Sequence, residues 1–260
     1  MATLPNLFVY IPTYNVSRQI SSLITDLEST LSSLRRSGHI RGYKIICVND
    51  GSTDDTSKIL ASLKRKVRSL EVISFRKNKG VVDATLAGMS RVAKLSKPDD
   101  IAIRMDSDYE HNPDDIPRLI SAIKDTSVQM CFAYTPLEMK LGYRFFMLNF
   151  LIGGYENKKL FGVWVPQFCP GFFAARASLL KSVLTEVKAA VKEYAQRYSS
   201  QMIHLDLYIA YLASRNGKVR FIKASPIKPE WIIRKPLTKV YRYLEAHNNF
   251  MEFIAGRKPR

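Results

Sequence analysis

Three absences narrow the class of protein. The 260-residue chain has only three cysteines, and Cys47, Cys131 and Cys169 show no paired spacing, which argues against a disulfide framework or a zinc site and favours a reducing compartment. Its most apolar stretch, residues 145–155, is shorter than the ~20 residues needed to cross a bilayer. The N-terminal sequence MATLPNLFVYIPTYN lacks the basic start and apolar middle of a signal peptide, so we expect a cytoplasmic location.

Acidic residues are scarce relative to basic ones. The chain has 23 Asp and Glu against 40 Lys and Arg, a formal net charge of +17 with a pI near 9.8. This excess predicts an anionic partner, and composition alone leaves nucleic acid, an acidic membrane surface and a phosphorylated substrate open. Twelve basic residues and three glutamates lie in residues 214–260, so the surplus is concentrated at the C-terminal end. A glycine-and-aromatic RNA-binding signature is missing, and we expect no nucleic-acid partner.

The first half of the chain alternates short apolar runs with helical patterns, which predicts an α/β fold with a doubly wound, mostly parallel, Rossmann-like sheet. Apolar residues recur every three or four positions between residues 20 and 34, and a second helix is expected at residues 81–95. The expected strands are residues 7–11, 44–48, 71–75, 101–105 and 130–134.

The second half is less regular. An aromatic, amphipathic helix is expected at residues 139–155, either in a membrane interface or in a core or subunit contact. A strand at residues 168–175 and another at 219–222 are also expected. Further helices are predicted at residues 177–198, at 203–216 and from residue 237 onward.

Three unusual segments follow expected strands, where ligands of open α/β sheets bind. They are residues 12–15, 49–56 and 106–110. In the third, the spacing of the alternate acids Asp106, Asp108 and Glu110 lets them point the same way and converge on a hard cation such as Mg²⁺ or Mn²⁺. The spacing alone equally allows a solvated acidic turn before a helix.

Two other loops have ordinary structural interpretations as well. Residues 50–53 form an Asp-Gly turn, and Thr53 or Asp54 is a suitable helix cap, an interpretation that the isolated pattern favours. The basic run at residues 76–80 faces either phosphate or water, and water is the more common case for a charged run.

Together these segments resemble family 2 inverting glycosyltransferases. The similar motifs are I-P-T-Y-N, V-N-D-G-S-T-D-D-T, N-K-G-x-x-x-A-x-x-x-G and M-D-S-D-x-x-H-x-P-x-D-I-P-x-L, beginning at Ile11, Val48, Asn78 and Met105. The last motif resembles the dolichyl- and polyprenyl-phosphate sugar synthases. The resemblance covers about residues 5 to 240 and is strongest over the first 120.

The resemblance implies a GT-A fold, a nucleotide-sugar donor and a divalent metal, Mg²⁺ or Mn²⁺. It makes residues 1–225 the catalytic domain and 226–260 a basic, amphipathic C-terminal helical segment packed on that domain or on a membrane. It gives Asp106 and Asp108 catalytic roles and assigns the metal to Asp106, Asp108 and Glu110. The residues that it places around the nucleotide sugar are Pro12, Tyr14, Asn15, Asp50, Asp106 and Ser107.

Two departures from the family pattern bear on the acceptor. Val16 stands where an acid commonly follows Y-N, which removes one expected contact, and Gln167 replaces an Asp that is a candidate base in relatives. A hydroxyl acceptor needs such a base, whereas a phosphate monoester with a second pKa of ~6 is already anionic. The expected acceptor and phosphate ligands are Arg144, Gln167, Arg234, Lys235 and Lys239.

The resulting hypothesis is transfer of a hexose from a UDP- or GDP-sugar to a polyprenyl or dolichyl phosphate, at the cytoplasmic face of an acidic membrane to which the protein binds peripherally. A family 2 enzyme that adds sugar to a glycan hydroxyl is the first rival hypothesis. A basic nucleic-acid-binding protein is the second, and a relative that binds nucleotide sugar without turnover is the third.

Overall fold

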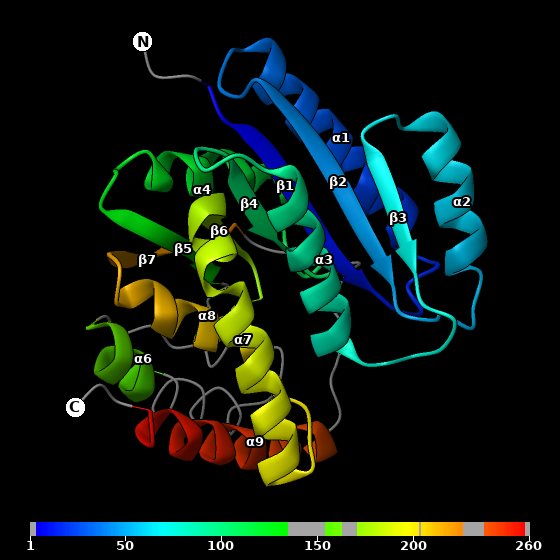
Figure 1. The fold of residues 1–260 in the computed structure, drawn as a ribbon. Helices are drawn as coiled ribbons and strands as arrows, with labels where there is room; N and C mark the ends of the chain where they lie inside the picture. The colour runs from blue at the N-terminus through cyan, green and yellow to red at the C-terminus, as the bar shows by residue number, and fades with distance from the viewer. Residues whose placement is uncertain (1–3, 135–153, 163–170, 203, 226–236, 258–260) are drawn as a thin grey trace.

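A computed structural model of the chain describes residues 4–134, 154–162, 171–202, 204–225 and 237–257 (Figure 1). Its centre is a seven-stranded sheet in the order β3-β2-β1-β4-β6-β5-β7. The strands are β1 (Asn6–Thr13), β2 (Gly42–Asn49), β3 (Leu70–Ser74), β4 (Ile101–Arg104), β5 (Val128–Tyr134), β6 (Phe173–Arg176) and β7 (Lys218–Lys223).

Helices cover both faces of the sheet. They are α1 (Ile20–Arg36), α2 (Thr56–Lys66), α3 (Val81–Leu95), the short 3₁₀ turn η1 (Pro113–Asp115), α4 (Ile116–Ile123), α6 (Gly154–Phe161), α7 (Ala177–Tyr198), α8 (Leu205–Ser214) and α9 (Leu237–Ala255). The expected α/β class and the mostly parallel sheet are confirmed. The expected strand at 168–175 corresponds to β6, which runs antiparallel to both β4 and β5, and residues 163–170 lie outside the described residues.

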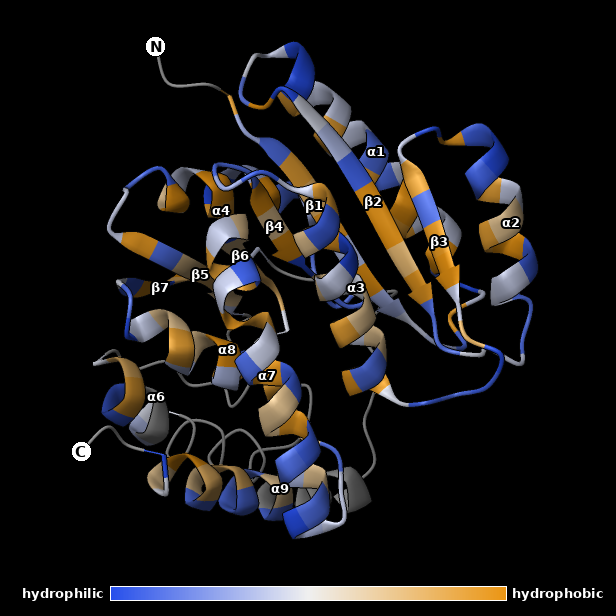
Figure 2. Ribbon diagram, in the orientation of Figure 1, coloured by the Kyte–Doolittle hydropathy of each residue, from blue (hydrophilic) through white to orange (hydrophobic). Residues whose placement is uncertain are grey.

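Side chains of β1 point alternately to the two faces of the sheet, and each face carries its own hydrophobic core. Leu7, Val9 and Ile11 pack with α1, α2 and α4 in one core cluster, whereas Phe8 and Tyr10 pack with α3, α7 and α8 in the other. Successive strand side chains point to opposite faces, so a strand buried on both faces is apolar throughout. Figure 2 shows the consequence: the central strands are mostly hydrophobic, whereas α2, α7 and α9 mix hydrophobic and hydrophilic residues.

A glycine in a left-handed conformation follows the end of α1. The helix stops at Arg36, and Gly38 has a φ of 70°, a left-handed conformation that glycine adopts without the steric cost of a β-carbon.

The C-terminal helix α9 packs on the rest of the fold. Phe250, Phe253 and Ile254 are at most 2% exposed and belong to the same core cluster as Tyr194 of α7 and Tyr208 of α8. The helix expected at residues 139–155 falls almost wholly outside the described residues. No helix in the described part of the chain has both the length and the apolar character to cross a bilayer. Cys47 and Cys131 are buried free thiols, and Cys169 lies outside the described residues.

The packing of α9 predicts a large effect of one truncation. The Phe253 ring lies 5.4 Å from the Tyr194 ring in an edge-on contact and 4.4 Å from the Arg257 guanidinium. Phe253→Ala should lower the free energy of unfolding by about 3–5 kcal/mol, because it empties a closed apolar site. Urea denaturation measures the change, with Glu245→Ala at an exposed position of α9 as the control. Equal stability of the two variants would contradict the described docking of α9.

Candidate functional site

A cavity of about 350 Å³ opens at the carboxyl ends of β1, β2 and β4. All three segments expected from the sequence contribute to its wall, together with the loop before α3. The lining residues are Pro12, Thr13, Tyr14, Val16, Asp50, Asn78, Val81, Ala84, Asp106, Ser107 and Asp108. Six of the sequence-predicted site residues therefore lie around one space, and Asn15 and Glu110 are not among its lining residues.

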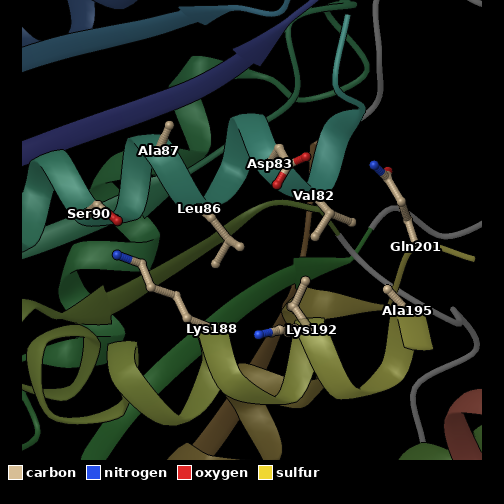
Figure 3. A pocket seen from close by; sticks show the side chains of 10 residues that line it. Val82, Asp83, Leu86, Ala87, Ser90, Lys188, Lys192, Ala195 and Gln201 are labelled. Carbon is tan, nitrogen blue, oxygen red and sulfur yellow. The ribbon is translucent and has the colours of Figure 1, made fainter. Parts of the chain in front are cut away.

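A second, larger cavity of about 550 Å³ lies elsewhere, between α3 and α7 (Figure 3). Asp83, Leu86 and Ser90 line it from α3, and Lys188 and Lys192 face them from α7. Its lining residues include none from a strand end. Because the carboxyl edge of the sheet collects loops from several strands, we place the functional site in the smaller cavity.

Asp50 ties two of the loops together. This carboxylate is 2% exposed, and its two oxygens accept the Lys79 amide at 2.7 Å and the Gly80 amide at 2.8 Å. Gly80 precedes the first turn of α3, so the carboxylate sits where the N-terminus of a helix favours negative charge. Asp50 thus holds the loop that supplies Asn78 to the cavity wall.

Gly51 allows the close approach of the same loop. It has a φ of 64°, and a β-carbon there would lie 2.8 Å from the Lys77 Cα. The Asp-Gly pair is therefore more than an isolated turn: Asp50 binds the neighbouring loop and Gly51 makes room for it.

In the basic run at residues 76–80, the Lys79 ammonium lies 4.9 Å from the Phe75 ring centroid.

Asn15 has a bracing role instead of lining the cavity. Its φ is 50°, and its side-chain oxygen accepts the Thr53 amide at 2.8 Å. Val16, a departure from the family pattern expected from the sequence, is 8% exposed, and its amide donates to Thr56 Oγ1 at 2.9 Å. The loops after β1 and β2 are consequently braced against each other, which fixes Tyr14, a 44% exposed ring at the cavity rim.

Asp54 completes this brace. Its carboxylate accepts the Ser17 amide at 3.1 Å and the Thr56 amide at 3.0 Å, the latter at the start of α2. Burial alone would raise the pKa of Asp54, but hydrogen bonds from Thr56 and Ser17 outweigh it and lower the pKa to about 2. The cap expected at Thr53 or Asp54 lies one residue further on: Asp55 occupies the cap position of α2 and its side chain makes no capping hydrogen bond, whereas Asp54, just before it, binds the Thr56 amide.

Asp106 is held from two sides. Its Oδ1 lies 2.8 Å from Nη2 of Arg104, the last residue of β4. The Asp106 amide donates to His111 Nδ1 at 3.0 Å, so the neutral imidazole carries its proton on Nε2, which lies 3.8 Å from Asp106 Oδ2. The ring of His111 stacks on Phe172 with centroids 5.1 Å apart. The carboxylate is one-third exposed, on the side of the cavity.

Asp108 and Glu110 are arranged differently from the sequence prediction. Asp108 lines the cavity, and its Oδ1 accepts the Glu110 amide at 3.2 Å. Across the described residues, no group of three or more His, Cys, Asp and Glu side chains is placed to hold a metal. Two carboxylates on one cavity, Asp106 and Asp108, nevertheless match the one or two that Mg²⁺ typically takes beside substrate phosphates, so this donor set fits such a cation.

Two neighbours of the candidate site, Arg104 and Asp206, belong to none of the motifs found in the sequence. Arg104 is only 6% exposed, and Asp206 of α8 lies behind it with 3.5 Å between Arg104 Nη1 and Asp206 Oδ2. The pKa of Asp206 is raised to about 6: burial raises it most, Arg104 lowers it and Asp106 raises it. The sequence signals that could have pointed to them are a charged residue, Arg104, inside an apolar strand and a single acid, Asp206, in an otherwise apolar helix.

The structure does not describe the side chains of the residues expected to bind the acceptor. Arg144, Gln167, Arg234 and Lys235 lie outside the described residues, and Lys239 lies in α9 at a position whose side chain is not described. Their assignment stays a prediction.

The depressed pKa of Asp54 gives a pH-dependent stability. A carboxylate whose folded pKa is about 2 and whose ordinary value is 3.8 stabilises the fold above pH ~4, and this contribution is lost as the pH falls toward 2. Asp54→Ala should lower the free energy of unfolding by about 1 kcal/mol at pH 7, and the difference should shrink below pH ~4. Asp55→Ala, at an exposed neighbour paired with Lys58, is the control. A difference between wild type and Asp54→Ala that stays constant with pH would contradict this role.

Comparisons with known proteins show the family of the chain. The model of glycosyl transferase family 2 matches residues 8–184, more than half of the chain. The UDP-N-acetylglucosamine–dolichyl-phosphate N-acetylglucosaminyltransferase of Methanococcus voltae is 29% identical over 207 residues, which cover 70% of this chain and 74% of the relative. The dolichol-phosphate mannosyltransferase of Pyrococcus furiosus is 33% identical over 119 residues, covering 46% of this chain and only 30% of that longer relative.

Solved structures show the fold. The mannosyltransferase PcManGT of Pyrobaculum calidifontis, solved with GDP-Man and Mn²⁺, has a TM-score of 0.59 at 15% identity and covers 99% of this chain and 66% of its own. The mannosyl-3-phosphoglycerate synthase of Rubrobacter xylanophilus has a TM-score of 0.58 at 16% identity. The match covers 98% of this chain and 74% of that structure's chain. The fold is the expected GT-A type. Because the family model matches residues 8–184, which include the loops around the cavity at the carboxyl edge of the sheet, the chain belongs to glycosyl transferase family 2.

Proposed function

We propose that this family 2 enzyme transfers a hexose from a nucleoside-diphosphate sugar to a polyprenyl or dolichyl phosphate, with inversion at the anomeric carbon. The observation that carries the proposal is the single cavity in which Asp106 and Asp108 lie with Tyr14 and Asp50. The acceptor class is supported by the names of the Methanococcus and Pyrococcus relatives, both of which act on dolichyl phosphate.

The donor side follows from the wall of the cavity. The exposed ring of Tyr14 offers a surface on which a nucleotide base can stack. Asp50 has one N–H bond on each oxygen, which leaves lone pairs to accept hydrogen bonds from the base or the ribose. The braced loops at residues 12–16 and 50–56 keep these groups in place before the donor arrives.

Asp106 and Asp108 would hold the metal, Mg²⁺ or Mn²⁺. When bound, such a cation neutralises charge on the diphosphate leaving group. Asp108 faces the cavity with one oxygen bonded to a backbone amide, and Asp106 faces it with Arg104 behind. These two side chains therefore orient the diphosphate relative to Tyr14 and Asp50.

A phosphate acceptor suits the described walls. They contain no histidine, and Asp50, the remaining carboxylate, is held by two backbone amides. A phosphate oxygen needs no base: it attacks the anomeric carbon opposite the diphosphate, the new C–O bond forms as the bond to the diphosphate breaks, and the diphosphate leaves with the electron pair. Arg144, Gln167, Arg234, Lys235 and Lys239 are proposed to position the acceptor phosphate.

Peripheral binding to the cytoplasmic face of an acidic membrane is part of the same proposal. A lipid-linked acceptor lies in a bilayer, and the local surplus of twelve basic residues over three glutamates at residues 214–260 favours anionic headgroups. The second candidate function, transfer to a glycan hydroxyl, shares the donor side and requires a base that the described walls do not supply.

The acceptor assignment is tested by product analysis. Purified protein with Mn²⁺ and labelled UDP- or GDP-sugars is offered undecaprenyl phosphate, dolichyl phosphate or free oligosaccharides. We expect label to move into the organic phase with the lipid phosphates only. Label in the oligosaccharide would instead establish the glycan-hydroxyl reaction.

Asp108→Asn tests the donor site. The amide oxygen of asparagine can still accept the Glu110 N–H, so the fold should persist while the metal loses an anionic ligand. In a thermal-shift series with UDP- and GDP-sugars, wild type should gain stability in the presence of Mn²⁺, and the variant should require at least about tenfold more nucleotide sugar for the same shift. Asp114→Asn, at an exposed carboxylate in η1, serves as the control. Equal shifts for wild type and Asp108→Asn would overturn the site.

A further inference from the structure

We propose that Arg104 is a positioning residue for the donor site: it fixes the Asp106 carboxylate toward the cavity and is itself held by Asp206 of α8 and the carbonyl of Gly171. The inference rests on the proposed function and adds to it Arg104 and Asp206, which no sequence motif of the site contains.

The strand geometry places Arg104 behind the site. In the sheet it pairs with Tyr10 of β1 on one side and with Phe173 of β6 on the other. Side chains alternate along β4, so Arg104 shares the face of Ala102, which belongs to the core cluster of α3, α7 and α8. The Arg104 side chain therefore lies between the sheet and the helices α3, α7 and α8, and its guanidinium group reaches Asp106.

Three acceptors surround the guanidinium. Nη2 lies 2.8 Å from Asp106 Oδ1, whereas Nη1 donates to the Gly171 carbonyl and lies 3.5 Å from Asp206 Oδ2. The planar fork of arginine directs its donors along fixed lines, so anchoring Nη1 also fixes the direction of Nη2. The position of Asp106 is thereby set by contacts made on α8 and just before β6.

Charge makes the arrangement interdependent. Arg104 is 6% exposed and Asp206 is 7% exposed, and an isolated charge buried to that extent is strongly unfavourable. Asp206 therefore compensates Arg104 on the inner side, and Arg104 compensates Asp106 on the outer side. On the other edge of Asp106, His111 accepts the Asp106 amide and places its Nε2 3.8 Å from Oδ2.

Gly171 provides the space for this network. A β-carbon there would overlap Arg104 Nη1 and lie 2.6 Å from Asp106 Oδ2. The close packing of backbone, guanidinium and carboxylate shows that the Arg104 position is built into the fold and is not a surface side chain resting on an acid.

The test compares nucleotide affinity across variants of the intact chain. Isothermal titration with UDP and GDP, each with and without Mn²⁺, gives the affinity without relying on turnover. Arg104→Lys keeps the charge and loses the fork, and Arg104→Met loses both. We expect binding in Mn²⁺ to weaken by about 10-fold for Arg104→Lys and by up to about 100-fold for Arg104→Met, as for other residues that orient a metal ligand.

Arg176→Met is the matched control for loss of an arginine. Arg176 lies at the opposite end of the same β4–β6 pair, opposite Ile101, and donates to the carbonyls of Ile123, Asp125 and Val128. We expect it to lower thermal stability and leave nucleotide affinity within about twofold of wild type. A purely structural role for Arg104 predicts the same behaviour in Arg104→Lys, and that result would overturn the proposal.

A double-mutant comparison tests the route through α8. If Asp206 acts by holding Arg104, Asp206→Asn should weaken nucleotide binding severalfold in the wild-type background and add little in the Arg104→Lys background. Additive effects would overturn the role of Asp206. Should Arg104→Met fail to fold, Arg104→Lys carries the comparison.

Failure of the proposal is distinguishable from failure of the proposed function. If wild type binds nucleotide, Asp108→Asn loses it and Arg104→Lys retains it, the function stands and the positioning role is overturned. If wild type binds no nucleotide, the function fails, and crystal structures of wild type and Arg104→Lys then decide the positioning role. An Asp106 carboxylate in the same place in both structures would overturn it, and a displaced carboxylate would support it.

Discussion

The pairing of β1 between β2 and β4 is the constraint on which the site depends. Thr13 is in register with Asn49, and Tyr10 with Arg104, so both neighbouring strands run parallel to β1 and end at the same edge. The loops that follow must then meet there, and Asp50, Asp106 and Asp108 are brought to one cavity. Without this pairing, the three acidic residues would lie in separate loops of an otherwise basic protein.

Each cavity carboxylate is supported from the protein side. Asp50 accepts two backbone amides, Asp106 faces Arg104 and His111, and Asp108 accepts the Glu110 amide. In a chain of net charge +17, these acids are a local reversal of sign, and donors behind them offset the repulsion between neighbouring carboxylates. The support also orients them, which a binding site for a cation and a diphosphate requires.

The helical layer on one face joins the site to the C-terminal part of the chain. Asp206 lies in the first turn of α8 and contacts Arg104, while Tyr208 of the same helix lies in the core cluster that includes Phe250 and Phe253 of α9. The Arg257 guanidinium donates to the Tyr208 hydroxyl at 3.0 Å. The helix that contacts Arg104 behind the cavity is therefore packed directly against the C-terminal helix of the described fold.

Local patterns in the sequence determined the element types and the site loops. The helix at 81–95 and the strands around residues 7–11 and 44–48 follow from helical periodicity and from short apolar runs, and the family motifs lie where those strands end. These features depend on neighbours within a few residues, so a sequence displays them. The tertiary structure alone decided that Asp206 meets Arg104, that Gly171 makes room for the guanidinium, and that β6 enters the sheet antiparallel. Such contacts join segments that are distant along the chain, and the hydrogen bonds and burial that favour them leave no periodic trace in either segment.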